Sequence, residues 1–377
     1  MSTSNKDKYV NYEDIYKNIV EDIAKYGMCG IDMTKWKVGF ENIGNSCFCN
    51  SVLQCLMHTT KFIELYSGGG IKSKINKEAK NTKGCLTAWL CAISNCYWSG
   101  TYSQITTVEI MNTIAQLLGE KYNGQLPESA FKFQELLLSQ LSDDVNEVSY
   151  PAGFVEHRDN IYLIYDNDIG KIFNDYETKI RSNISSCIYN IFRNVQIRIF
   201  SCSCTATKIT FQEKLSIDMD ITWDESNTDL QSCLTRHFQN YTSNEMCPRC
   251  PNREIPVTFY IWKLPQILVI HLGRFFDGKK NNRFIEFPLE ELDMTNYLHP
   301  NSSDNELDKS NLIYSLYAIM EHYTIPVEHF TAKIKNKETK EWLWCNDKIV
   351  TNLNSSDIKT NAAYILYYKR KDMTDLK

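Results

Sequence analysis

Residues 39–56 read Gly39-Phe40-Glu41-Asn42-Ile43-Gly44-Asn45-Ser46-Cys47-Phe48-Cys49-Asn50-Ser51-Val52-Leu53-Gln54-Cys55-Leu56. Turn residues precede Cys47 and apolar side chains recur at a helical spacing after it, which predicts a helix that begins at Cys47. Unpaired backbone N–H groups and the helix dipole favour a negative charge at a helix start, so a cysteine there is well placed to act as a thiolate nucleophile. Taken alone, Cys47 is about as well explained as a buried structural cysteine.

A nucleophilic cysteine also needs a base and a group that orients the base, and the C-terminal half of the chain offers both. His329 stands at the start of an expected strand, and Asn346-Asp347 follow the next one. If these strands pair antiparallel, the amide or the carboxylate reaches the imidazole. The order cysteine, histidine, asparagine or aspartate is typical of papain-like hydrolases. A lone histidine before a strand is more often structural, so only the combination favours catalysis.

Length and composition are those of an ordinary folded protein. The chain has 377 residues, 43% of them hydrophobic and 23% charged, with a formal net charge of -5. This balance gives no sign of nucleic-acid binding, and no apolar run approaches the roughly 20 residues that cross a bilayer. The N-terminus is polar and has no secretory signal. We therefore expect a cytoplasmic or nuclear protein without a membrane span, and its 14 cysteines are expected to be thiols, metal ligands or a nucleophile rather than disulfides.

The chain changes character near residue 183, from helical patterns to short runs rich in β-branched and aromatic residues. Helices are expected at Tyr12 to Lys25, Cys47 to Met57, Thr107 to Leu118, Ser129 to Leu141 and Leu230 to Tyr241. Strands are expected at Val195 to Phe200, Lys208 to Phe211, Pro256 to Trp262, Gln266 to Leu272, Ile313 to Met320, Phe330 to Ile334, Trp342 to Trp344 and Ala363 to Tyr368. The polar segment His299 to Ser310 is interpreted as a flexible insertion. Helices followed by strands indicate the α+β class.

Two close cysteine pairs suggest a metal site. They are Cys202 and Cys204, separated by one residue, and Cys247 and Cys250, which have the usual C-x-x-C spacing. Four thiolates suit a structural zinc ion, which would join two β-hairpins. Four unliganded thiols are the alternative, because short motifs of this kind also occur by chance.

Three groups of motifs resemble the ubiquitin-specific proteases, which are papain-like deubiquitinating cysteine peptidases. Residues Gly39 to Leu56 are similar to the cysteine box of that family. The histidine box is matched by Tyr314 to Ile319, His322, Glu328 to Ala332, Trp342, Asn346-Asp347, Val350 and Ala363 to Tyr368, and the sequence between the boxes by Leu264 to Phe275, Phe287-Pro288 and Leu292 to Met294. The resemblance therefore covers about Gly39 to Arg370.

This resemblance implies a fold with a helical thumb, β-rich fingers and a β-sheet palm. The implied boundaries are an N-terminal extension at 1–37, a catalytic domain at 38–370 with the thumb at about 38–185, fingers at about 190–262 and palm at about 263–370, and a C-terminal tail at 371–377. The fingers of the family often carry a zinc site, at the place of the two cysteine pairs. No catalytic cofactor is implied.

The resemblance also implies a role for each polar residue of the site. Cys47 would attack the carbonyl after the C-terminal glycine of ubiquitin, and His329 would act as its base. Asn346 would orient the imidazole, although Asn346 and Asp347 could exchange roles. Asn42 would donate an N–H to the oxyanion, a contribution of about 3 kcal/mol. The implied partners are ubiquitin and ubiquitinated proteins.

Departures from the family pattern lie beside these residues. Glu328 replaces a small residue before His329, so it could obstruct the channel for the ubiquitin tail or raise the imidazole pKa. Ser129 and Lys132 replace acidic residues that help to hold the basic tail. Two alternatives to an active deubiquitinase follow: a weakly active or inactive ubiquitin-binding scaffold, or a hydrolase of another ubiquitin-like modifier.

Overall fold

The computed structural model describes residues 37–67, 70–148, 160–164, 169–223, 229–306, 312–337 and 339–371, so the helix predicted at Tyr12 to Lys25 lies outside the described residues. The chain divides into two compact units. The first comprises Met1–Glu147 with Cys345–Val350, and the second Val148–Trp344 with Thr351–Lys377. None of the helices in the described ranges is both long and apolar enough to span a membrane.

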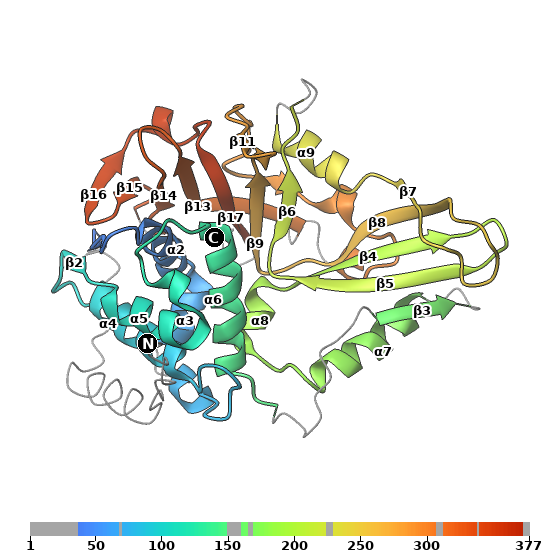
Figure 1. The fold of residues 1–377 in the computed structure, drawn as a ribbon, viewed down its shortest axis with the longest axis horizontal. Helices are drawn as coiled ribbons and strands as arrows, with labels where there is room; N and C mark the ends of the chain where they lie inside the picture. The colour runs from blue at the N-terminus through green and yellow to red at the C-terminus, as the bar shows by residue number, and fades with distance from the viewer. Residues whose placement is uncertain are drawn as a thin grey trace, which may run out of the picture. The chain divides into compact units, whose positions relative to one another are not determined.

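The first unit is helical (Figure 1). Its elements are β1 (Gly39–Phe40), α2 (Cys47–Met57), α3 (Thr60–Ser67), η1 (Gly70–Lys74), α4 (Cys85–Trp98), β2 (Gln104–Ile105), α5 (Val108–Leu118), η2 (Glu120–Tyr122) and α6 (Ala130–Asp144). Every residue of α2 is buried. Its Phe48 ring meets the Phe133 ring of α6 edge to face, with 5.1 Å between centroids. The helix predicted to begin at Cys47 is thus the centre of this core.

A buried carboxylate holds the start of α4. Asp144, at the end of α6, accepts hydrogen bonds from the backbone N–H groups of Gly84 (2.9 Å) and Thr87 (2.8 Å), and from the Thr82 hydroxyl. The two backbone N–H groups are among those that a helix start leaves without intrahelical partners. The cap comes from a residue about 60 positions away in the sequence, so the two helices are fixed to each other.

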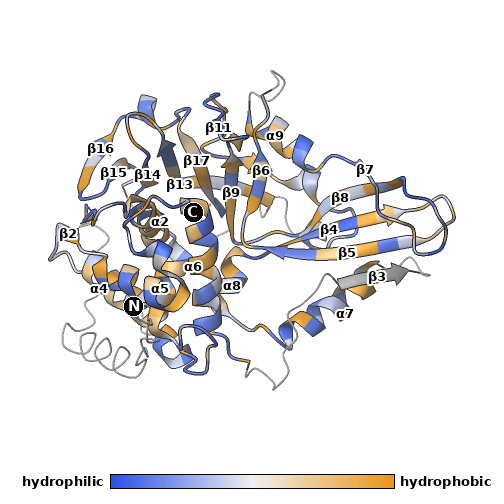
Figure 2. Ribbon diagram, viewed as in Figure 1, coloured by the Kyte–Doolittle hydropathy of each residue, from blue (hydrophilic) through white to orange (hydrophobic). Residues whose placement is uncertain are grey.

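Two sheets make up most of the second unit. One has the strand order β3-β5-β4-β8-β7, and α7 (Ile169–Arg181) covers one of its faces through Phe173, Tyr176 and Ile180 (Figure 1). Its strands are β3 (Asn160–Ile164), β4 (Asn194–Ser201), β5 (Thr207–Lys214), β7 (Tyr241–Ser243) and β8 (Ile255–Lys263). Figure 2 shows the mixed hydropathy of α7 that a helix covering a sheet requires.

The larger sheet has the order β16-β15-β14-β13-β17-β9-β6, with β12 also paired to β13. Its strands are β6 (Ile217–Asp220), β9 (Ile267–Gly273), β12 (Leu292–Asp293), β13 (Ile313–Tyr323), β14 (His329–Lys335), β15 (Trp342–Asn346), β16 (Ile349–Leu353) and β17 (Ala363–Arg370). The remaining elements are α8 (Cys187–Phe192), α9 (Leu230–His237), the hairpin β10 (Phe275–Phe276) and β11 (Lys279–Lys280), and the short helices η3 (Thr295–Tyr297), η4 (Ser303–Glu306) and η6 (Ser355–Asp357). The central strands β9 and β17 are almost wholly buried, so they read as continuous apolar runs.

Two sequence predictions are wrong in extent. The helix expected at Leu230 to Tyr241 ends at His237, and Tyr241 already belongs to β7. The segment interpreted as a flexible insertion is tied to β8 over its described part: the His299 N–H donates to the Ile261 carbonyl and the Asp304 carboxylate accepts from the Leu264 N–H (2.7 Å). Polar side chains that satisfy backbone groups look like loop residues in a sequence.

Candidate active site and four-cysteine site

Cys47 is the first residue of α2, as predicted, and is 6% exposed. The turn before it is fixed by close backbone approach. Gly44 has φ +97°, and a Cβ atom there would lie 2.7 Å from the Gly124 carbonyl oxygen, so only glycine fits. The Asn45 N–H donates to that same carbonyl at 2.8 Å. This turn sets the position of the helix start, and with it the position of the thiol.

Asn42 lies beside this turn with both ends of its amide engaged. Its Oδ1 accepts from the Ser46 N–H at 3.2 Å, and its Nδ2 donates to Asp347 Oδ2 at 2.8 Å. Because the oxygen and the nitrogen have different partners, the orientation of the amide is defined.

Asp347 joins the segment Cys345–Val350 to the start of the first unit. Its Oδ2 accepts from Asn42 and its Oδ1 from Asn50 Nδ2, each at 2.8 Å, while its backbone carbonyl accepts from the Phe40 N–H at 3.0 Å. Asp347 has φ +51°, a left-handed conformation that aspartate and asparagine tolerate better than most residues. The structure thus brings Cys47, Asn42 and Asp347 into one unit, where Asn42 and Asp347 are in direct contact.

His329 belongs to the second unit, and Asn346 to the segment Cys345–Val350 of the first. His329 is the first residue of β14, half-buried, and pairs with Tyr323 of β13. Asn346 is the last residue of β15, the neighbour of β14 in the sheet. His329 thus stands at the start of its strand as predicted, whereas Asn346, predicted to follow its strand, is the last residue of it.

Glu328 has a partner that the sequence reasoning did not consider. Its Oε1 lies 3.1 Å from Nε2 of His322, on the preceding strand, and the Glu328 side chain is 44% exposed whereas that of His322 is 2% exposed. Burial, helped by nearby Lys280, lowers the pKa of His322 to about 3. The imidazole is therefore neutral, and because a carboxylate can only accept, Nε2 carries the proton. The register of β13 with β14, which pairs His322 with Phe330, places the two side chains within reach of each other.

Ser129, one of the two departures in the first unit, has a local structural role. Ser129 is the N-cap of α6, and its hydroxyl accepts from the Lys132 N–H at 3.4 Å. Serine is among the favoured residues at that position.

The four cysteines of the two pairs come together in the second unit. Cys202 and Cys204 lie in the turn between β4 and β5, and Cys247 and Cys250 in the loop between β7 and β8, with their sulfur atoms all within 4.8 Å of one another. Two cross-pairs, Cys202 with Cys250 and Cys204 with Cys247, have Sγ–Sγ distances of 3.6 Å. Hydrogen bonding from the backbone N–H of Cys204, with contributions from the other three thiols, lowers the pKa of Cys202 to about 6.

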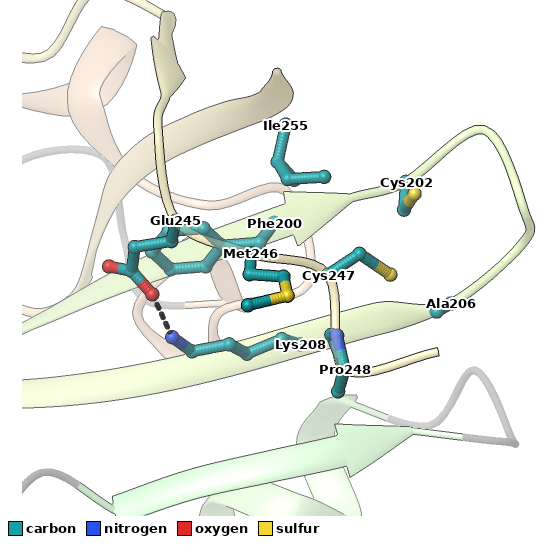
Figure 3. Close-up of a pocket in the computed structure, with 9 residues that line it drawn as sticks. All are labelled: Phe200, Cys202, Ala206, Lys208, Glu245, Met246, Cys247, Pro248 and Ile255. Atoms are coloured by element: carbon teal, nitrogen blue, oxygen red, sulfur yellow. Dashed lines mark hydrogen bonds and ion pairs between the residues drawn. The ribbon is translucent and has the colours of Figure 1, made fainter. Parts of the chain in front are cut away.

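A small apolar pocket adjoins this cluster (Figure 3). Phe200, Met246 and Ile255 contribute apolar side chains, and Lys208 and Glu245 form an ion pair beside them at 2.5 Å. The sequence reasoning did not identify this pocket, since its lining comes from three separate strands and loops.

The chain is similar to known proteins over most of its length. A family model described as ubiquitin carboxyl-terminal hydrolase matches residues 38–368. Ubiquitin carboxyl-terminal hydrolase 2 of Homo sapiens is 26% identical over 352 residues, which are 88% of this chain and 54% of that protein. Ubiquitin carboxyl-terminal hydrolase Usp2 of Drosophila melanogaster is 26% identical over 377 residues, covering 96% of this chain and 37% of that protein. The chain thus spans about half or less of the length of these relatives.

Among solved structures, the SAGA Ubp8/Sgf11/Sus1/Sgf73 DUB module bound to ubiquitin aldehyde is similar with a TM-score of 0.69 and 21% identity, over 98% of this chain and 77% of that one. Another structure of the SAGA Ubp8/Sgf11/Sus1/Sgf73 DUB module gives a TM-score of 0.62 and 20% identity, over 98% of this chain and 75% of that one. At this identity the likeness shows the fold, and it confirms the predicted α+β architecture.

Proposed function

Because this chain belongs to the ubiquitin carboxyl-terminal hydrolase family, we propose that it is a cysteine-type deubiquitinase that hydrolyses the isopeptide or peptide bond after the C-terminal glycine of ubiquitin. The observation that carries the proposal is Cys47 at the first residue of a buried helix, after a turn in which a carboxylate fixes the orientation of the Asn42 amide. The same proposal includes a thumb at about 38–185, fingers at about 190–262 and a palm at about 263–370.

In the proposed mechanism Cys47 is the nucleophile and His329 its base. His329 takes the thiol proton, and the thiolate, favoured by the N-terminus of α2, adds to the carbonyl carbon of the ubiquitin glycine. The protonated imidazole then gives its proton to the leaving amine, and a thioester remains. Water, deprotonated by the same imidazole, hydrolyses the thioester and regenerates the thiol.

Asn42 is assigned to the oxyanion. A side-chain amide carries two N–H groups, of which one donates to Asp347, and we assign the other to the oxygen that becomes negative during attack. A donor that is already oriented needs no rearrangement when the charge develops, which is the source of such stabilisation.

Asn346 is the better candidate for orienting His329. Both carboxylate oxygens of Asp347 already accept from the side chains of Asn42 and Asn50. We therefore assign Asp347 to the oxyanion side of the site and Asn346 to the imidazole.

The four cysteines are proposed to hold a structural zinc ion. Zinc binds thiolates at about 2.3 Å in a tetrahedron, which places the sulfur atoms about 3.8 Å apart. The two Sγ–Sγ distances of 3.6 Å and the mutual limit of 4.8 Å fit that arrangement. The ion would join the β4–β5 turn to the β7–β8 loop and supply folding stability.

The deciding experiment is reaction with ubiquitin that carries a C-terminal electrophile. We expect a covalent adduct with the unmodified protein and none with Cys47→Ala. Cys49→Ala is the matched control, because Cys49 is a buried neighbour on the same helix whose thiol pKa is raised by burial and by Cys47. Binding of ubiquitin without an adduct would indicate a scaffold instead. An adduct only with another ubiquitin-like modifier would change the substrate.

A further inference from the structure

A buried ion pair joins β14, the strand that begins at His329, to its neighbour β13. Glu321 of β13 and Lys333 of β14 are 0% and 4% exposed, with Lys333 Nζ 2.6 Å from Glu321 Oε1. Removing two charges from water is costly unless nearly all their hydrogen bonds are satisfied. The residues around such a pair must therefore be arranged so that they satisfy its hydrogen bonds.

The hydrogen bonds of the pair are supplied by three segments. Glu321 also accepts from the hydroxyls of Thr331 (3.1 Å) and Thr360. Lys333 Nζ also donates to the backbone carbonyls of Asp357 (2.7 Å) and, more weakly, Ile358 (3.4 Å). The pair therefore joins β13, β14 and the segment from Asp357, the end of η6, to Thr360, all within the second unit.

The network reaches to within two residues of the proposed base. Side chains alternate along a strand, so Thr331 and Lys333 share the face of β14 on which His329 lies. Thr331 Oγ1 also accepts from Trp344 Nε1 at 3.3 Å, which links β14 to β15. Trp344 is in turn two residues before Asn346, the proposed partner of the base. The same polar cluster thus contacts Trp344 of β15 and holds β14 two residues beyond His329.

We propose that Glu321 and Lys333 are positioning residues, which fix β14 behind His329 and so hold its imidazole in the reactive geometry. This inference rests on the proposed function. The pair carries no net charge, and we assign its effect on His329 to the position of the strand. A misplacement of about 1 Å can lower a rate about a hundredfold without weakening substrate binding. The predicted signature is therefore a lower kcat with an unchanged KM.

The test compares four variants in hydrolysis of a ubiquitin C-terminal fluorogenic amide, with Tm measured on each sample. Glu321→Gln and Lys333→Met each leave one buried charge without its partner and should lower Tm. The double variant removes both charges at similar volume, and it leaves no buried charge without its partner, which is the most costly situation for stability. We expect the double variant to regain much of the lost Tm while kcat stays at least about tenfold below that of the unmodified protein, with KM within about twofold. Lys335→Met is the matched control, because Lys335 lies on the same strand but pairs with Glu290 at the surface.

A double variant with the kcat of the unmodified protein would overturn the proposal, since the pair would then be structural only. If the double variant does not fold, Thr331→Val decides, because it keeps the shape of the side chain and removes the links to Glu321 and Trp344. A kcat unchanged by Thr331→Val would also overturn the proposal, and a lower kcat at constant KM would support it. Absence of turnover by the unmodified protein would instead refute the proposed function.

Discussion

Asp347→Asn tests the assignment of Asp347 to the oxyanion side of the site. The carboxylate accepts the amide N–H groups of Asn42 and Asn50 at 2.8 Å, and a hydrogen bond to a charged group contributes about 1.5–3 kcal/mol. An amide in its place has one acceptor oxygen and turns its NH₂ group against one of the two donors. The backbone is not strained, since asparagine also tolerates the left-handed φ of +51°.

The expected loss in kcat depends on how firmly Asn42 keeps its orientation in the Asp347→Asn variant. Removing an oxyanion donor altogether lowers kcat by about 10²- to 10³-fold. Asp347→Asn leaves Asn42 in place but weakens the hold on its orientation, so we expect a smaller loss, about 10- to 100-fold in kcat, with KM nearly unchanged. The assay is steady-state hydrolysis of the ubiquitin fluorogenic amide, with Tm measured in parallel to show that the variant is folded.

A double-mutant cycle with Asn42→Ala distinguishes this role from a role at the imidazole. If Asp347 acts through Asn42, then Asp347→Asn costs less than about threefold in kcat once Asn42 is alanine. Multiplicative losses would refute the reasoning and assign Asp347 to His329 instead. Asn346→Ala, combined with Asn42→Ala, provides the comparison, because the proposed roles of these residues are separate and their effects should multiply.

Three further outcomes are expected. Glu328→Gly should change kcat/KM for the ubiquitin amide less than about threefold, because the carboxylate contacts His322; a tenfold rise would show that it obstructs the substrate. Cys250→Ser should abolish stoichiometric zinc in elemental analysis and make Tm insensitive to a chelator, while the adduct with the ubiquitin electrophile still forms. The His322 pKa of about 3 lies below its unfolded value near 6.5, so its contribution to stability is complete above pH 6.5 and is lost as pH falls, by roughly 2 kcal/mol at pH 5. His322→Gln should therefore give a shallower pH dependence of the urea midpoint between pH 7 and 5, and an identical dependence would contradict the neutral buried imidazole.

The sequence predicted elements well where the signal is local. The limits of α2 match the prediction because a turn and a helical period coincide at Cys47. By contrast, α4 was not predicted: most of its residues are buried, so no polar face marks its period, and its cap is the distant Asp144. For α7 the signal was present in the spacing of Phe173, Tyr176 and Ile180 and was not used.

The candidate site also combines features with a local sequence signal and features that depend on long-range contacts. The residues around Cys47 follow from a contiguous motif, whereas the Asn42–Asp347 contact joins positions 305 residues apart and could not be read from periodicity. The partner of Glu328 also depends on tertiary structure, because only the register of β13 with β14 places His322 within reach. Residue types therefore led to the groups proposed to react, while the structure supplied the contacts that hold Asn42 and Asp347 in place.

The stability that the four-cysteine site provides should be local. The apolar cluster around it contains Phe200, Ala206, Ile255 and Val257 besides the cysteines, so without a metal few apolar contacts remain there. Nearer to α7, the same sheet is held by a larger cluster and by Arg193, which is 4% exposed and donates to both Glu177 and Glu213. Cooperative units open according to their own contacts. Metal loss is therefore expected to loosen the ends of β4, β5 and β8 and to leave the part of the sheet under α7 folded.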